Sequence, residues 1–123
     1  MIVKQTYLER FNEIRSRLPA LMQEAGAELS EGKESGFTRF VEEVDILRTR
    51  FNLLQPPVEF RRLHRALARL VRQFTVVANL AKLFLKTGSP EYLELLDQKL
   101  DPLSELGDKF HKEIQRHNAR HSA

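Results

Sequence analysis

The chain has 123 residues, of which 41% are hydrophobic and 30% are charged, as is usual for a globular domain of this size. Cysteine is absent, which excludes disulfide bonds, thiolate nucleophiles, iron–sulfur clusters and cysteine-based zinc sites. The net charge of +3 is unevenly distributed, because residues 55–88 carry +6, residues 1–54 carry −1 and residues 89–123 carry −2. We therefore expect one domain over residues 1–123, with a single basic segment.

Residues 6–29 are predicted to form the first helix, because their apolar side chains fall on one stripe of a helix. The stripe consists of Tyr7, Leu8, Phe11, Ile14, Leu18, Leu21, Met22, Ala25 and Leu29. Pro19 lies inside this pattern, where it removes a backbone hydrogen bond, so we expect a kink near residues 15–18 or a break. Residues 30–36 contain two glycines and little to bury, and they are interpreted as a loop.

Residues 37–54 are predicted to form the second helix, which ends at Gln55-Pro56-Pro57. Its apolar residues recur at steps of three and four: Phe37, Phe40, Val41, Val44, Leu47, Phe51 and Leu54. The acidic residues Glu42, Glu43 and Asp45 are interpreted as part of its solvated face.

Residues 57–87 are predicted to form a third helix about 45 Å long, with the clearest pattern of the chain. Its apolar residues alternate steps of three and four without a miss: Phe60, Leu63, Leu67, Leu70, Phe74, Val77, Ala81 and Phe84. Gly88 is expected to cap the C-terminal end of this helix, and Ser89-Pro90 is expected to begin the next one.

The fourth helix is expected to contain Leu93, Leu96, Leu100, Leu103, Phe110 and Ile114. Asp101-Pro102 lies in its middle, so this helix is predicted to be kinked there or split into two. Residues 117–123 are expected to fray. Four amphipathic segments with short connections predict an all-α fold, namely an antiparallel bundle of about four helices.

One face of the third helix is strongly cationic. Five arginines within twelve residues occupy an arc of about 100° opposite the apolar stripe: Arg61, Arg62, Arg65, Arg69 and Arg72. We call this set the arginine face.

Guanidinium groups match phosphate and carboxylate, so the arginine face is a candidate site for nucleic acid or another polyanion. The alternative is a solvated face whose charge is neutralised by acidic residues of the neighbouring helices. No aromatic residues are interleaved with the arginines, and no nucleic-acid-binding motif accompanies them.

A second apolar stripe on the third helix contains Val76, Leu80 and Leu83. A bundle helix normally buries one stripe, so an additional stripe requires another contact. Another part of the same chain covers it, with the 30–36 loop or a terminal helix as the candidate, or a ligand covers it, or the protein self-associates through it.

Near the C-terminus, Arg116-His117-Asn118-Ala119-Arg120-His121 resembles the Arg-x4-His motif of the HEPN ribonuclease family, whose members are also helical bundles. In that family the arginine and the histidine serve RNA cleavage, often across a dimer. The resemblance covers six residues and implies that Arg116 and His121 take part in cleaving RNA.

The histidines suggest no metal site, because the paired Glu-x-x-His motifs of di-metal bundles are missing, and no cofactor is predicted. His64 lies beside the apolar stripe of the third helix and is expected to be partly buried and hydrogen-bonded. No other motif of a catalytic site is present, so an enzyme is disfavoured.

The N-terminal segment has charges at Lys4 and Glu9 and lacks the apolar core of a signal peptide. The longest apolar-rich stretch, residues 74–85, is too short to span a membrane, so we expect a cytoplasmic protein.

Three functional hypotheses follow from these patterns. The first is a non-catalytic interaction or scaffold module that self-associates as a homo-oligomer through Val76, Leu80 and Leu83, or binds another protein. The second is binding of nucleic acid or another polyanion through the arginine face. The third is ribonuclease activity like that of the HEPN family.

Overall fold

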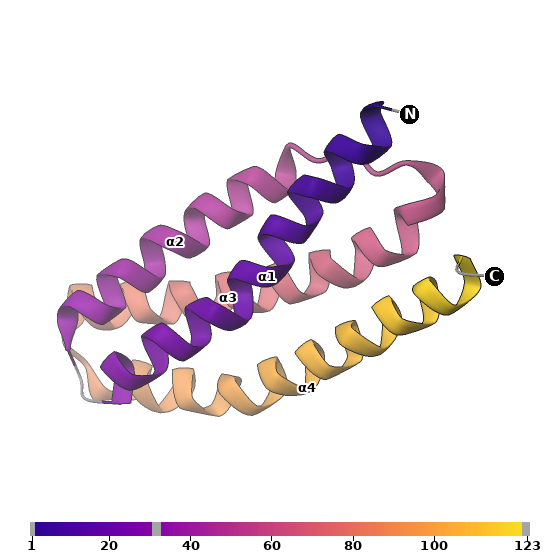
Figure 1. Ribbon diagram of the computed structural model, residues 1–123. Coiled ribbons are helices and arrows are strands. Elements are labelled where there is room, and N and C mark those ends of the chain that lie inside the picture. The colour runs from indigo at the N-terminus through magenta and orange to yellow at the C-terminus, as the bar shows by residue number, and fades with distance from the viewer. Residues whose placement is uncertain (1, 31–32, 122–123) are drawn as a thin grey trace.

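The structure, a computed structural model, describes residues 2–30 and 33–121 (Figure 1). Its helices are α1 (Ile2–Ser30), α2 (Glu34–Asn52), α3 (Arg61–Thr87) and α4 (Pro90–His121), and a short 3-10 helix, η1 (Val58–Phe60), precedes α3. Successive helices run in opposite directions along the bundle (Figure 1). The predicted all-α antiparallel bundle is confirmed. None of the helices in the described ranges is both long and apolar enough to cross a membrane.

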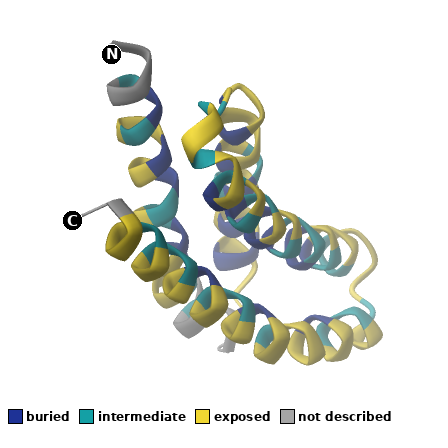
Figure 2. Cartoon of the chain, turned by 90° about the vertical axis from the view of Figure 1, so that its right-hand side faces the viewer, coloured by how far each residue is buried: buried dark blue, intermediate teal, exposed yellow. Residues whose placement is uncertain are grey.

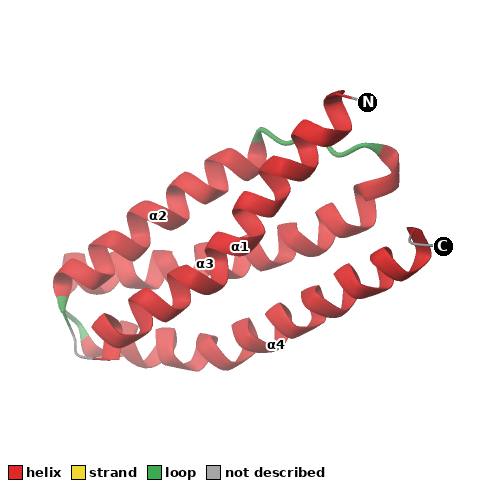
Figure 3. Ribbon diagram, in the orientation of Figure 1, coloured by secondary structure: helices red, strands yellow, loops and turns green. Residues whose placement is uncertain are grey.

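Both internal prolines lie within continuous helices, so α1 is not broken at Pro19 and α4 is not split at Pro102 (Figure 3). Each proline is exposed to solvent, whereas Leu18, Leu21 and Leu103 beside them are buried. Each proline removes one backbone hydrogen bond of its helix. The free energy gained by burying the neighbouring leucine side chains exceeds this loss, so the helix continues through the proline. The kinks remain a prediction.

The helix ends differ from the predicted ones by a few residues. α2 begins at Glu34 rather than Phe37, because the Lys33 carbonyl accepts a hydrogen bond from the Gly36 N–H at 3.1 Å and closes a helical turn early. α4 continues as a helix to His121, through part of the segment that was expected to fray. The predicted cap of α3 is confirmed, since Gly88 has a left-handed φ of 68° and its N–H donates to the Phe84 carbonyl at 2.7 Å.

α3 is the central helix, which packs against both α2 and α4, while α1 packs against α2. The buried residues of each helix face the interior, and the exposed ones face outward (Figure 2). Aromatic pairs connect helices across the core. Phe40 of α2 stacks on Phe74 of α3, and Phe11 of α1 packs against Phe110 of α4 with ring centroids 6.0 Å apart. Apart from Leu8, the described residues of the predicted apolar stripes form or pack against one core, while the side chains of Ala25 and Leu29 lie outside the described part of the structure.

His64 of α3 is half-buried in this core. Its Nδ1 lies 3.0 Å from the Tyr7 hydroxyl of α1, and its ring stacks on Phe51 of α2 at 4.5 Å. Burial lowers the pKa of His64 and raises the pKa of Tyr7 to about 12, so both groups are neutral at pH 7. The predicted structural role of His64 is confirmed, because it joins three helices through a neutral hydrogen bond and ring packing.

Candidate functional site

The arginine face lies on the solvent side of α3, and all five of its arginines are exposed. Arg62 forms an ion pair with Glu113 of α4, with Nε and Oε2 3.4 Å apart. Within residues 2–30 and 33–121, the other four arginines form no ion pair: Arg61, Arg65, Arg69 and Arg72. Of the five arginines, only Arg62 is neutralised by a carboxylate of a neighbouring helix in the described structure.

Two acidic residues of α2, Glu43 and Asp45, pair with cations outside the arginine face. Glu43 accepts hydrogen bonds from Arg17 of α1, which also binds Glu24, and these contacts raise the pKa of Arg17 and lower that of Glu24. Asp45 lies 3.3 Å from the Nζ of Lys82, near the C-terminal end of α3. Glu43 and Asp45 therefore stabilise the contacts of α2 with α1 and with the far end of α3, and neither pairs with the arginine face.

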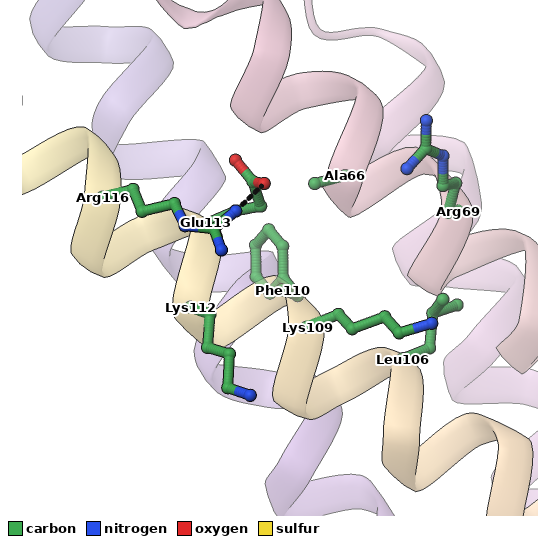
Figure 4. A pocket seen from close by; sticks show the side chains of 8 residues that line it. All are labelled: Ala66, Arg69, Leu106, Lys109, Phe110, Lys112, Glu113 and Arg116. Carbon is green, nitrogen blue, oxygen red and sulfur yellow. Dashed lines mark hydrogen bonds and ion pairs between the residues drawn. The ribbon is translucent and has the colours of Figure 1, made fainter.

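α4 adds further cations to this surface. A groove of about 230 Å³ runs between α3 and α4, and Figure 4 shows the side chains that line it. α3 contributes Ala66 and Arg69, and α4 contributes Leu106, Lys109, Phe110, Lys112, Glu113 and Arg116. Phe110 is buried at the bottom of the groove, while Lys112 points away from α3 (Figure 4). We call this feature the basic groove.

Glu113 is the only carboxylate among the residues that line the basic groove. It is shared between two guanidinium groups, because its Oε1 lies 3.1 Å from Nη1 of Arg116 and its Oε2 pairs with Arg62. One negative charge cannot neutralise Arg62, Arg69, Lys109 and Arg116 together. The groove therefore has a positive potential that favours an anionic ligand.

The arginine face also borders a second depression, of about 300 Å³, between α2 and α3. Arg72 lines it together with Arg48 of α2, and Arg48 lies 3.7 Å from Asp45. Arg69 thus faces α4 while Arg72 faces α2. The positive surface extends across three helices, with α3 at its centre.

The structure places the three residues of the second apolar stripe in different surroundings. Leu80 is half-buried and packs against the core, Val76 is half-buried, and Leu83 is 39% exposed. Arg69 of α3 and Leu106 of α4 line the same groove. Because the two helices are antiparallel, Leu80, eleven residues after Arg69, and Leu95, eleven residues before Leu106, lie at a similar height along the bundle. Leu95 is 42% exposed. Leu83 and Leu95 are the apolar residues that remain open in this region of α3 and α4.

The HEPN-like motif lies at the end of α4. Arg116 points into the basic groove and pairs with Glu113, whereas the side chain of His121 lies outside the described part of the structure. Five residues along a continuous helix correspond to a rotation of roughly 140°, so the two positions lie on different faces of α4.

No cluster of three or more histidine, aspartate or glutamate residues that could hold a metal ion occurs among the residues that the structure describes. The sequence predicted the arginine face but not that Lys109, Lys112 and Arg116 of α4 lie beside it, although Arg116 was named for the HEPN-like motif. Their spacing of three and four is a helical signal, but the surrounding acidic residues of α4 obscure it.

The fold and the site define a four-helix bundle whose central helix presents an open cationic surface. No protein-family model matches the chain, and no curated protein or solved structure is significantly similar to it.

Proposed function

We propose that the protein binds the phosphate backbone of nucleic acid through the arginine face and the basic groove. The observation that supports this proposal is the set of four exposed arginines of α3 without a carboxylate partner in the described structure, beside the additional cations of α4. Each phosphate oxygen offers the acceptor that a guanidinium fork requires.

The extent of the positive surface favours a polyanion over a single small anion. Arg61 and Arg72 are eleven residues apart, which corresponds to about 16 Å along α3. Duplex DNA carries one charge per about 1.7 Å of its axis, so several phosphates fall within that length. With no exposed aromatic ring among these arginines, the proposed contacts are to the backbone and are independent of base sequence.

The energetics of α3 agree with a binding role. Arg61, Arg65 and Arg69 follow one another at four-residue spacing, and like charges at this spacing destabilise a helix by about 0.2–0.5 kcal/mol per pair. Among the described residues none of these three arginines forms an ion pair with a carboxylate, and bound phosphates would reduce their mutual repulsion.

The proposal predicts a steep salt dependence. In fluorescence anisotropy with a 20-base-pair DNA duplex and an RNA duplex, the logarithm of the association constant should fall with the logarithm of salt concentration, with a slope of about −0.9 per phosphate contacted on DNA. Replacing Arg65, Arg69 and Arg72 by glutamine should make this slope shallower by about 2.7, whereas Glu113→Gln should strengthen binding because it removes the only carboxylate of the groove lining.

The matched control replaces Arg10, Arg39 and Arg50, which lie on α1 and α2, by glutamine and removes the same charge. If both triple variants lose the same affinity, or if the wild type does not bind at low salt, the proposed surface is wrong. Electrophoresis of the RNA after each titration also tests the third hypothesis, since RNA that is cleaved by the wild type but not by His121→Ala would support ribonuclease activity.

We propose self-association through α3 and α4 as a second candidate function, supported by the exposure of Leu83 and Leu95. Leu83→Glu should convert an oligomer to a monomer in light scattering, because it places a charge in an apolar contact. Leu80 is less suitable for this test, since it packs against the core. Leu53→Glu, at a site that is 72% exposed on the α2–η1 connection, is the control. A monomeric wild type would exclude this candidate.

A further inference from the structure

A further cavity, of about 460 Å³ and separate from the basic groove and from the depression beside Arg72, lies between α1, the start of α3 and the end of α4. Its lining comes from four elements, and the apolar part includes Phe11 of α1, Phe60 of η1, Leu63 of α3 and Ile114 of α4. Asn12, Arg15, His117 and Asn118 place polar groups in the same lining. Its volume falls in the range of about 300–1,000 Å³ that is usual for small-molecule sites, and it combines an apolar body with a few polar groups.

Arg15 is the unusual residue of this cavity. It is half-buried, its Nε is shielded from solvent, and this Nε has no hydrogen-bond partner in the structure. Arg17, two residues further along α1, binds two carboxylates by contrast. The guanidinium of Arg15 is partly shielded from water and has no anion beside it in the described structure. Buried donors are normally hydrogen-bonded, so we expect a ligand to supply the acceptor.

We propose that this cavity binds a medium-chain fatty acid, with its carboxylate at Arg15 and its hydrocarbon chain against Phe11, Phe60 and Ile114. A planar carboxylate pairs with two nitrogens of a guanidinium at once. The terminal nitrogens of Arg15, which lines the cavity, offer such a pair. The hydrocarbon chain displaces water from the apolar walls, which is the main favourable contribution for a ligand of this kind.

This site is independent of the proposed nucleic-acid surface. The basic groove gathers several cations around a narrow apolar floor, whereas this cavity has one arginine in its lining and a larger apolar wall. A polyphosphate chain would leave most of its charges without a partner here, and a fatty acid carries only one charge.

The test is a titration of the full chain with decanoate, followed by heteronuclear NMR. The Nε–H resonance of Arg15 and the backbone amides near Phe11 and Ile114 should shift together with one binding curve. Arg15→Gln should weaken decanoate binding at least tenfold, and 1-decanol should bind wild type and Arg15→Gln equally, because it lacks the carboxylate.

Arg10→Gln is the matched control, since it removes the same charge from α1 at a position outside this cavity and should leave decanoate binding unchanged. Arg69→Gln should weaken nucleic-acid binding without changing decanoate binding, which separates the two proposals. Absence of any shift with decanoate would overturn the proposal. Equal decanoate affinity of wild type and Arg15→Gln would overturn the assigned role of Arg15, and with it the carboxylate site.

Discussion

Replacement of Phe40 by alanine is expected to lower the free energy of unfolding by about 3–5 kcal/mol. The Phe40 side chain is 0% exposed, and its ring stacks on Phe74 with centroids 6.3 Å apart, between α2 and the central helix α3. Truncation removes the transfer free energy of the ring and leaves a cavity that a rigid interior fills only in part. Urea denaturation, followed by circular dichroism at 222 nm, measures the change.

Leu53→Ala is the control for this experiment, because Leu53 is 72% exposed and its truncation should change the free energy of unfolding by less than about 0.5 kcal/mol. Phe40→Leu retains most of the apolar volume and should lose less than Phe40→Ala. A Phe40→Ala protein as stable as the Leu53→Ala protein would mean that Phe40 is not in the core.

Replacement of Gly36 by alanine is expected to destabilise the protein by about 1–3 kcal/mol, although alanine is the better helix former. Gly36 is buried where α2 approaches α1, and a Cβ at this position would overlap with the Cβ of Glu28 and lie 2.7 Å from its Oε2. The Cβ of Glu28 is held by the backbone of α1, so the two helices would have to move apart.

Gly107→Ala provides the matched comparison, because an added Cβ on this glycine of α4 meets nothing within 4 Å. It should stabilise the protein by about 0.5–1 kcal/mol, since alanine loses less backbone entropy on folding. Thermal unfolding of both variants measures the two effects. Equal melting temperatures would show that α1 and α2 do not approach as closely as described.

The prediction of helix interiors was more accurate than that of helix ends. The residues of the predicted apolar stripe from Leu63 to Ala81 are all buried in the core, and Phe84, further along α3, is partly buried against it. The start of α2 was misplaced by three residues because its first turn depends on backbone hydrogen bonds from Gly36 and Phe37 to the Lys33 carbonyl, which no side-chain pattern reveals. A kink or a break was predicted at Pro19 and at Pro102, and the helices are continuous at both prolines, because packing of neighbouring leucines outweighs the loss of one hydrogen bond.

The sequence predicted the arginine face of the candidate site but not the basic groove. The arginine face is a property of one helix, so the spacing of its five arginines reveals it. The basic groove also requires Lys109 and Arg116, which are about forty residues away along the chain and lie beside Arg69 only after α4 folds back on α3. The partial burial of Leu80 has the same origin, since it depends on contacts that the folded chain creates.

The four amphipathic helices, most of the core and the positive side of α3 follow from the sequence, because helical periodicity is set by residues three and four positions apart. The ion pairs between helices follow only from the folded chain: Glu43 pairs with Arg17, Asp45 with Lys82, and Glu113 with Arg62. It also decided that Arg15 lines an apolar cavity. The physical reason is that pairing between helices depends on how their side chains interdigitate, and this relation joins residues that are distant in the chain.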